Sequence, residues 1–412
     1  MHIWIINLFS DLPGEGAGEG RFLTLTKVFA EMGHEVTWWT MDFHHRTKSR
    51  RSENMRQAAE LELQQYGFSG SIRIRMVPVS KYFKNISFKR IHSHRSFAKQ
   101  LLKLAQPARQ LEPPERIVVS SPPLTAGEVA LELGHMYQCP VALDLTDQWP
   151  NTFERVLPGG SKLRKCLGHV FFYPQYALAR RLYREASYVS AVSQEYLDDA
   201  SACAPKQRMH LCYIGGNIHS PSVIKNSSSP AQPVRFIYVG AMTGSYDLVT
   251  ILRAARLLRD MGHVFEIHFA GSGYDEAKLR QYADQNELSE HCQFHGFLEQ
   301  NQLNTLLDEM DVGLNAIRTK IAITMPHKLS DYLCAGLPVI NSLPGEADAL
   351  LRNAGCGRFY TAGNADSLAE VMKVYLKRDI LFVDRQQAGA LAARGFDRSQ
   401  TYPNWARAII EQ

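Results

Sequence analysis

The densest group of chemically active side chains lies in TMPHKLSDYLCAGLPVI, residues 324–340. The spacing of its apolar residues predicts a helix over 327–335, with Lys328 in the first turn and Asp331 three positions later on the same face. The helix dipole opposes a cation at a helix N-terminus, so a nearby anion would stabilise it. The pattern therefore indicates either an anion-binding lysine or a local Lys–Asp pair without a further role.

A second candidate is the loop DLPGEGAGEGRF, residues 11–22, in which glycines alternate with other residues. The dinucleotide fingerprint G-x-G-x-x-G fails from every starting glycine, and Glu15 and Glu19 would repel a pyrophosphate. Asp42, at the end of the second predicted strand, would suit a ribose hydroxyl, so an NAD site is one interpretation. The others are a surface turn, and a backbone-lined wall for a sugar or second substrate with Arg21 as its only cation.

Three further strand ends carry small or acidic residues. YVGAMTGSYDL (238–248) places small and hydroxyl-bearing residues before a predicted helix, as in an anion nest. AGSGYDEAKL (270–279) also fails the fingerprint, and a tight strand-to-helix turn explains it equally well. In DLTDQWP (144–150), Asp144 and Asp147 are catalytic candidates at a strand end, or else a helix cap and a turn aspartate. Neither a D-x-D pattern nor a His/Cys cluster occurs, so the sequence predicts no metal site.

Strands and helices alternate through the whole chain. Residues 3–9 form a continuous apolar run, typical of a strand buried on both faces, and a segment with helical spacing follows at 22–32. Further strands are predicted at 35–41, 116–121, 141–145 and 188–193. After a stretch rich in Ser, Pro and Asn the alternation restarts, with strands at 234–240, 265–271, 292–297, 311–317 and 338–342, and helices at 247–261, 274–286, 299–309 and 327–335.

This alternation predicts an α/β protein with two doubly wound, Rossmann-like domains that face a central cleft. Ligands of such sheets bind beyond the carboxyl ends of the strands, so the cleft is the expected site. The expected parts are an N-terminal domain, a linker, a C-terminal domain and a helical tail that could pack back on the N-terminal domain; they span residues 1–216, 217–233, 234–384 and 385–412.

Composition limits the partners and the cellular compartment that can be expected for the chain. The chain has 412 residues and a net charge of +5, which permits attraction to an anionic surface but gives no reason to expect a nucleic-acid partner. Its seven cysteines form no CxxC pair, as expected for reduced thiols in the cytoplasm. The apolar N-terminus lacks the basic flank of a signal peptide, and no apolar run is long enough to span a membrane.

With these motifs in order, the whole chain resembles bacterial family 4 glycosyltransferases, which have the GT-B fold, retain anomeric configuration and use nucleotide sugars. The most specific matches are D-x-x-D-x-W-P at 144–150 and P-x-K-x-x-[DE]-Y-L-x-x-G-x-P-V-I at 326–340. SSPP (120–123), AVSQEYL (191–197) and HGFLEQNQL (295–303) also match. The resemblance is greatest to members that build lipopolysaccharide O-antigen or capsule repeats, including amino-sugar transferases.

The resemblance implies that the C-terminal domain binds the nucleotide sugar and the N-terminal domain binds the acceptor. Asp331 would bind the ribose hydroxyls, Lys328 would neutralise the leaving diphosphate, and Asp147 would act at the rim on the acceptor side. Further donor-binding residues would be Gly240, Thr243, Gly244, Ser245, Gly271, Gly296, Phe297, Thr324, Met325, Pro326 and His327. The acceptor and sugar side would include Gly16, Gly18, Gly20 and Arg21.

Two features of that family are missing: an acid is replaced by Ile323, and an arginine by Ala241. Neutralisation of the diphosphate would then rest on Lys328 and on the amides of 243–245, with help from Arg21 or Lys320.

The expected function is transfer of a hexosyl or N-acetylhexosaminyl group, from a UDP-sugar in preference to a GDP-sugar, to a glycan or polyprenyl-linked acceptor, without a metal or other cofactor. The alternatives are a UDP-sugar epimerase of GT-B type and a non-catalytic subunit that binds nucleotide or glycan. Residues 81–95 and 162–184 mix Lys and Arg with aromatic residues. Such segments suit peripheral binding to the anionic inner face of the plasma membrane, or else they are ordinary solvated helix faces.

Overall fold

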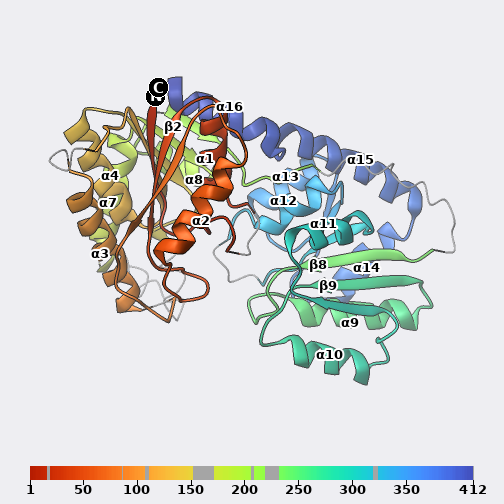
Figure 1. Cartoon of the computed structure of the whole chain (residues 1–412). Coiled ribbons are helices and arrows are strands. Elements are labelled where there is room, and N and C mark those ends of the chain that lie inside the picture. Colours follow the sequence, from red (N-terminus) through yellow and green to blue (C-terminus); the bar gives the residue numbers. More distant parts are fainter. Residues whose placement is uncertain are drawn as a thin grey trace. The chain divides into compact units, whose positions relative to one another are not determined.

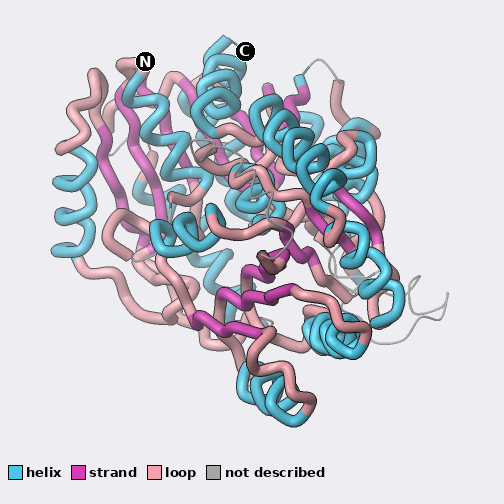
Figure 2. The backbone as a smooth tube through the Cα atoms, turned by 90° about the vertical axis from the view of Figure 1, so that its right-hand side faces the viewer, coloured by secondary structure: helices cyan, strands magenta, loops and turns pink. Residues whose placement is uncertain are grey.

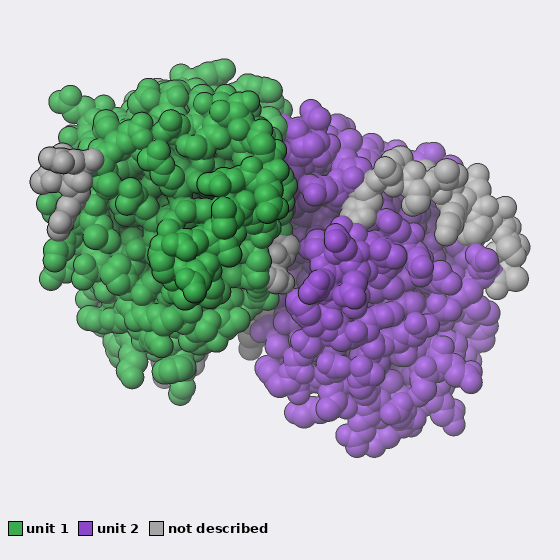
Figure 3. Space-filling model, viewed as in Figure 1, with its two compact units in different colours: residues 1–212, 402–412 green, residues 213–401 purple. Residues whose placement is uncertain are grey.

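The computed structural model describes residues 1–15, 19–85, 87–106, 111–151, 171–205, 208–218, 232–318 and 323–411. The chain divides into two compact units, which Figure 3 shows in different colours. Unit 1 comprises residues 1–212 and 402–412, and unit 2 comprises residues 213–401. Most of the predicted linker, 217–233, lies outside the described residues.

Unit 1 is built on a seven-stranded sheet with the order β3-β2-β1-β4-β5-β6-β7, in which every neighbouring pair is parallel. Its strands are β1 (His2–Ile6), β2 (Glu35–Met41), β3 (Ile72–Val77), β4 (Arg116–Ser121), β5 (Val141–Leu145), β6 (Tyr188–Ala191) and β7 (Met209–Leu211). Its helices are α1 (Arg21–Glu31), α2 (Glu53–Gln64), α3 (Phe88–Leu104), α4 (Leu124–Tyr137), α7 (Tyr173–Glu185) and α8 (Gln194–Ser201).

Helices cover both faces of this sheet. Apolar residues of α1, α2 and the C-terminal helix α16 (Arg398–Glu411) form a core on one face, and α3, α4 and α7 lie along the other (Figure 1). The predicted strands at 116–121 and 141–145 are confirmed as β4 and β5. The prediction succeeded because strands that are buried on both faces are rich in apolar residues. β3 escaped prediction because it is an edge strand, in which exposed Arg73 and Arg75 interrupt the apolar run.

Unit 2 repeats the design with a six-stranded parallel sheet in the order β10-β9-β8-β11-β12-β13. Its strands are β8 (Val234–Val239), β9 (Phe265–Ala270), β10 (Cys292–Gly296), β11 (Val312–Asn315), β12 (Val339–Asn341) and β13 (Gly357–Phe359). Its helices are α9 (Leu248–Asp260), α10 (Glu276–Gln285), α11 (Gln300–Asp308), α12 (His327–Cys334), α13 (Glu346–Asn353), α14 (Ala365–Tyr375) and α15 (Arg378–Gly395). Figure 2 shows the strands and helices of both units.

The helical tail is divided between the units. Ala388, Leu391 and Ala392 of α15 pack in a core of unit 2 together with Phe396. In α16, by contrast, Tyr402, Trp405, Ala406 and Ile409 are buried in the core of unit 1. The last helix therefore completes the first unit.

The strand order locates the expected ligand edge of each sheet. In unit 2 the order reverses between β8 and β11, and in unit 1 between β1 and β4. Ligands of doubly wound sheets bind at the carboxyl ends of the strands beside this reversal. Among the residues described above, no helix is both long and apolar enough to cross a lipid bilayer.

Candidate functional site

Three glycine-containing strand ends in unit 2 pack directly against one another. Gly240, after β8, donates its amide to the carbonyl of Ala270 at 2.9 Å, and Gly271, after β9, donates to that of Gly296 at 2.7 Å. Gly271 has a φ of +136°, and a Cβ there would lie 2.0 Å from the Gly240 carbonyl oxygen. Glycine is therefore required here by close backbone packing, which explains AGSG as a tight turn.

Lys328 extends from the first turn of α12 to the end of β8. Its Nζ lies 4.0 Å from the ring centroid of Tyr238 and 4.2 Å from that of Tyr246. A Cβ at Gly240 would lie 3.2 Å from the same nitrogen. The side chain is 7% exposed, and within the described residues its Nζ has no hydrogen-bond partner. The lysine amine thus lies beside the topological reversal of the sheet, and no described residue uses its hydrogen-bonding capacity.

The surroundings of Lys328 disfavour its charge. Burial lowers its pKa from 10.5 to about 7, although Asp331 acts in the opposite direction. The N-terminus of α12 adds the positive end of a helix dipole at the same place. An anion bound here would relieve both effects, because it would supply the missing charge partner and complement the dipole. This arrangement favours the anion-binding interpretation over a simple Lys–Asp pair.

Helix α12 is fixed by a buried tyrosine one residue beyond Asp331. The hydroxyl of Tyr332 accepts a hydrogen bond from the amide of Val239 at 2.8 Å and donates to the carbonyl of Leu314 at 3.2 Å. A Cβ at Gly313 would lie 2.5 Å from the tyrosine ring. Tyr332 therefore holds α12 against both strands of the reversal, and Asp331, which is partly exposed, is held in position with it.

The predicted anion nest after β8 is partly occupied. The amide of Gly244 donates to the hydroxyl of Tyr274 at 2.9 Å, and Ser245 is exposed. Just beyond, Asp247 at the start of α9 is 4% exposed and accepts hydrogen bonds from Thr250, Tyr360 and Gly363. A buried carboxylate at this helix N-terminus would repel a second anion. The electrostatics therefore favour α12 and Lys328 over α9 as the anion site.

The other predicted donor residues differ in how deeply they are buried. Thr324 and Met325 are 5% and 6% exposed, and Pro326 begins α12 in an extended conformation. His327 is exposed, as is Phe297 beyond the end of β10, where 62% of its surface is accessible. Thr243 is partly exposed. Lys320 lies outside the described residues.

Both positions that depart from the resembled family lie within the residues that the structure describes. Ala241 is exposed, and its carbonyl accepts a hydrogen bond from the hydroxyl of Tyr238 at 2.8 Å. Ile323 is partly exposed. Neither side chain offers a charge, and the amine of Lys328 lies beside the end of β8.

Arg21 of unit 1 lies in a different setting from the one that the sequence suggested. Its guanidinium forms a two-pronged ion pair with Asp144, with both contacts at 2.8 Å, and donates to the carbonyl of Cys212 at 2.8 Å. It also lies 4.0 Å from the ring centroid of Trp405. Arg21 and Asp144 are 7% and 0% exposed. The charge that we expected to reach a diphosphate is engaged in joining α1, β5 and α16.

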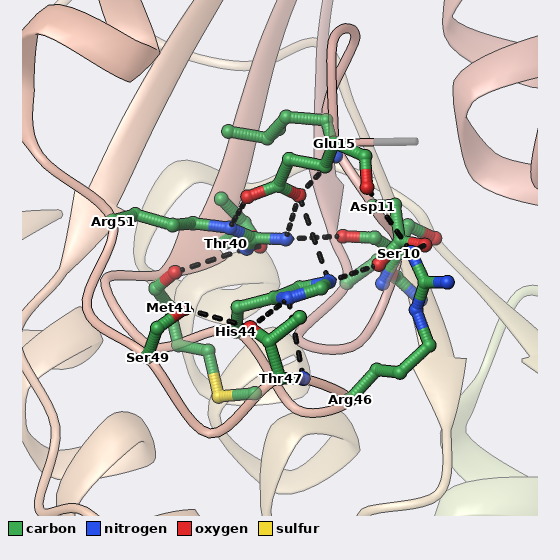
Figure 4. Close-up of polar contacts among 12 residues, drawn as sticks. Ser10, Asp11, Glu15, Thr40, Met41, His44, Arg46, Thr47, Ser49 and Arg51 are labelled. Atoms are coloured by element: carbon green, nitrogen blue, oxygen red, sulfur yellow. Dashed lines mark hydrogen bonds and ion pairs between the residues drawn. The ribbon is translucent and has the colours of Figure 1, made fainter. Parts of the chain in front are cut away.

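The glutamates of the glycine-rich loop are also engaged with cations. Figure 4 shows Glu15 with Arg51, which donates to both carboxylate oxygens at 2.8 and 2.7 Å. Burial opposes ionisation of Glu15, but Arg51 outweighs it and lowers the pKa of the carboxyl. Glu19 pairs with Lys27. Gly20 precedes α1, whereas Gly16 and Gly18 lie outside the described residues.

A metal-like grouping in the same loop is satisfied by the protein itself. Ligand atoms of Asp11, Glu15 and His44 lie within 4.8 Å of one another. However, Arg51 neutralises Glu15, and Asp11 pairs with both His44 and Arg46 (Figure 4). The geometry is that of a buried polar network that anchors the loop to the segment after β2.

Asp147 lines a cavity of about 270 Å³ at the carboxyl end of β5 in unit 1. One of its carboxylate oxygens accepts a hydrogen bond from the amide of Gln148 at 2.7 Å. The other lining residues include Trp149, Tyr176, Tyr183, Tyr196 and Asp199. Aromatic faces next to carboxylates suit a sugar, whose C–H face stacks and whose hydroxyls donate.

Sequence reasoning missed two tyrosines that lie against Lys328 and a third that fixes α12. Tyr238, Tyr246 and Tyr332 come from β8, the loop after it and α12, and each reads as an ordinary core aromatic. The available signal was that tyrosine rather than phenylalanine occurs at two buried positions and one partly buried position, since a buried hydroxyl needs a partner.

Comparisons with known proteins give a family match for part of the chain. Residues 221–391 match the family described as glycosyl transferases group 1. A 144-residue part of the chain is 28% identical to the amylovoran biosynthesis glycosyltransferase AmsK of Erwinia amylovora. That match covers 34% of this chain and 35% of the relative, so the chain is aligned to about a third of AmsK.

Solved structures match over the whole chain. The Anabaena protein Alr3699/HepE, solved with UDP and with UDP-glucose, covers 100% of both chains with a TM-score of 0.64 at 16% identity for the UDP complex. WaaG, a glycosyltransferase involved in lipopolysaccharide biosynthesis, also covers 100% of both chains, with a TM-score of 0.61 at 14% identity. With its two parallel α/β sheets the chain thus has the GT-B fold, and its second unit carries the match to the glycosyl transferases group 1.

Proposed function

We propose that the chain is a retaining glycosyltransferase that moves a sugar from a nucleotide sugar, preferably a UDP-sugar, to a glycan or polyprenyl-linked acceptor. Unit 2 binds the donor, and unit 1 binds the acceptor. The observation that carries the proposal is the buried amine of Lys328 at the strand reversal of the sheet, whose Nζ has no hydrogen-bond partner among the described residues. A diphosphate is the anion that a nucleotide sugar brings to this position.

The chemistry follows from that charge. The bond between C1 of the sugar and the diphosphate oxygen breaks, and its electron pair leaves with the diphosphate. The acceptor oxygen bonds to C1 on the same face, and its proton passes to the departing phosphate. Lys328 and the N-terminus of α12 stabilise the charge that develops on the leaving group, so no metal is required for that role.

The choice of uridine as the nucleoside and of polysaccharide biosynthesis as the pathway class is supported by proteins to which the chain is similar. HepE was solved with UDP and UDP-glucose, AmsK acts in amylovoran biosynthesis, and WaaG acts in lipopolysaccharide biosynthesis. We assign this chain by analogy to a surface polysaccharide, with Asp331 on the ribose hydroxyls and Phe297 beside the base. A hexosyl and an N-acetylhexosaminyl group are both compatible with this proposal.

The test is a screen of UDP- and GDP-sugars with a glycan or polyprenyl-linked acceptor. A transferase releases nucleoside diphosphate only when the acceptor is present. An epimerase changes the sugar without an acceptor, and a non-catalytic subunit binds nucleotide without either reaction. The neutral residues Ala241 and Ile323 give the last outcome a specific basis, because they replace charged groups of the resembled family. Either of the last two outcomes would overturn the proposal.

Asp331→Ala is expected to weaken UDP binding roughly tenfold to hundredfold, the loss typical of hydrogen bonds to a carboxylate. Asp331→Glu keeps the charge and is expected to retain most of the affinity. Asp366→Ala, which removes an exposed carboxylate from α14, is the matched control and should bind as the wild type does. Calorimetric titration with UDP measures all three, and unchanged affinity in Asp331→Ala would remove this residue from the donor site.

We also propose that unit 1 binds the anionic inner face of the plasma membrane, so that the protein is a peripheral cytoplasmic enzyme. Three large apolar side chains around the start of α3 are exposed: Phe83 at 72%, Phe88 at 88% and Ile91 at 47%. Lys81, Lys84 and Lys89 lie among them in the sequence and are also exposed. Apolar side chains that insert beside lysines suit a surface of anionic lipid. Of the other predicted segment, 162–184, residues 162–170 lie outside the described residues.

The double variant Phe83→Ser and Phe88→Ser is expected to bind anionic vesicles roughly tenfold or more weakly, because two apolar side chains no longer insert. Flotation with anionic and zwitterionic vesicles at low and high salt measures this. Val264→Ser removes a comparably exposed apolar residue, 63% accessible, from unit 2 and serves as the control. Two results would contradict the assignment. One is equal flotation of wild type and double variant with anionic vesicles, and the other is equal flotation of the wild type with anionic and with zwitterionic vesicles.

A further inference from the structure

A cluster of aromatic rings gathers in unit 1 near the carboxyl ends of β1, β2 and β5. The ring centroids of Phe9 and His45 lie 5.2 Å apart, and those of Phe9 and His94 lie 5.5 Å apart. His94 and Trp149 are separated by 6.1 Å. These four rings come from three loops and from α3, and His94 itself is 4% exposed. We call this group, together with Arg90, the ring cluster.

Arg90 of α3 lies between two rings of the cluster. The centre of its guanidinium is 5.5 Å from the centroid of Phe9 and 6.0 Å from that of Trp149. One terminal nitrogen donates to the carbonyl of Asn85 at 2.9 Å, and the side chain also bonds to Tyr82. In the part of the chain that the structure describes, its Nε has no hydrogen-bond partner. A partly buried cation therefore retains an unused N–H.

The imidazoles beside Arg90 are held neutral. Burial, followed by the charges of Arg90 and His45, lowers the pKa of His94 to about 3. Burial, Lys48 and Arg90 likewise lower the pKa of His45 to about 4. Burial is the largest cause of both shifts, and the charge of Arg90 adds to it, so both imidazoles favour the neutral form.

His94 adds a second unused polar atom. Its Nε2 is buried and, among the described residues, has no hydrogen-bond partner. Leaving a buried polar atom unsatisfied is costly, so a pair of them at one place indicates a position where a ligand completes the bonding. The unused atoms of Arg90 and His94 therefore point to the same kind of ligand, an anion with several acceptor oxygens.

The surroundings specify the ligand further. A guanidinium and an imidazole are typical partners of a phosphate. Trp149 is partly exposed and offers a flat face to the C–H side of a sugar ring, while Asp147, whose charge acts on Arg90, can accept sugar hydroxyls. We infer that the ring cluster binds a sugar phosphate, with the phosphate at Arg90 and His94 and the sugar against Trp149. This inference deepens the proposed function, on which it rests, because the sugar phosphate would be part of the acceptor.

The chain offers a direct probe of this site. Of its five tryptophans, Trp4, Trp38, Trp39 and Trp405 are at most 2% exposed, so Trp149 is the one that a ligand in solution can reach. Titration with glucose 1-phosphate is expected to change the tryptophan fluorescence saturably, and inorganic phosphate should compete. Glucose at the same concentration should bind much more weakly. No saturable change in the wild type, by fluorescence or by calorimetry, would overturn the inference.

Variants separate a binding role from a structural one. Arg90→Gln and His94→Gln are each expected to weaken binding of glucose 1-phosphate roughly tenfold or more, since the first removes the charge of the guanidinium and the second removes the imidazole ring. Arg95→Gln removes an exposed charge from the same helix and should bind as the wild type does. Trp149→Phe should lose the fluorescence signal while calorimetry still detects binding. Wild-type affinity in both Arg90→Gln and His94→Gln, with unfolding midpoints unchanged, would contradict the assignment.

The source of the sugar phosphate is distinguished by a second ligand. A hexose linked to a polyprenyl diphosphate in detergent presents the same ring and phosphate with a lipid attached. Tighter binding of the lipid-linked form than of glucose 1-phosphate assigns the site to a lipid-linked acceptor, and equal binding assigns it to a soluble one. UDP titration of the same protein reports on unit 2. Sugar phosphate binding without UDP binding would therefore refute the proposed function and leave the ring cluster site standing.

Discussion

Replacing Lys328 by methionine is expected to lower the rate of sugar transfer by roughly 10²- to 10³-fold, the usual loss when a preorganised group that stabilises a leaving charge is removed. Methionine fills a similar volume beside Tyr238 and Tyr246, so the change removes the charge with little effect on packing. The measurement is the initial rate of nucleoside diphosphate release with donor and acceptor present. Lys278→Met on α10, an exposed lysine of the same unit, is the matched control and should keep the wild-type rate.

Lys328→Met is expected to lower the rate of sugar transfer without lowering the free energy of unfolding. Lys328 has a pKa of about 7 in the folded chain against the ordinary 10.5, so the unfolded chain binds more protons between these values. The free energy of unfolding of unit 2 without ligand therefore increases as pH rises through that window. At lower pH the charged, buried lysine destabilises the folded state. Lys328→Met should remove this pH dependence and be at least as stable as the wild type below pH 7. A variant that loses both activity and stability would indicate a structural role for Lys328.

Asp144→Ala is expected to lower the free energy of unfolding of unit 1 by about 3–5 kcal/mol, because it leaves the buried guanidinium of Arg21 without its partner. Urea unfolding followed by tryptophan fluorescence measures this effect selectively, because all five tryptophans belong to unit 1. The matched control is Glu185→Ala, which breaks the exposed pair with Arg181 and should cost less than about 1 kcal/mol. Similar losses in the two variants would show that the pair of Arg21 and Asp144 does not hold unit 1 together.

The sequence predicted the framework of the fold because buried parallel strands are continuous apolar runs. The expected strands at 116–121 and 141–145 match β4 and β5, and the helix expected at 327–335 matches α12, His327–Cys334. Helical spacing also placed Lys328 and Asp331 correctly within that helix. The edge strand β3 was missed because its outward residues are polar.

What the sequence could not provide was the pairing of distant residues. Arg21 and Asp144 are 123 positions apart, and Glu15 and Arg51 are 36 apart, so no local pattern reveals that these charges neutralise each other. The glycine-rich loop therefore suggested more available charge than the folded chain offers. The role of Tyr332 as the anchor of α12 is likewise visible only when β8 and β11 are adjacent.

The central claim, that Lys328 receives the diphosphate of a nucleotide sugar, is tested most directly by calorimetric titration with UDP at about pH 8 in two buffers of different ionisation enthalpy. With a pKa of about 7, Lys328 is mostly neutral in the free protein at that pH, and a bound diphosphate raises its pKa. The wild type is therefore expected to take up a proton as it binds UDP, and Lys328→Met should bind more weakly without proton uptake. Binding of UDP with equal affinity and equal proton uptake in both proteins, or no binding by the wild type, would contradict the account.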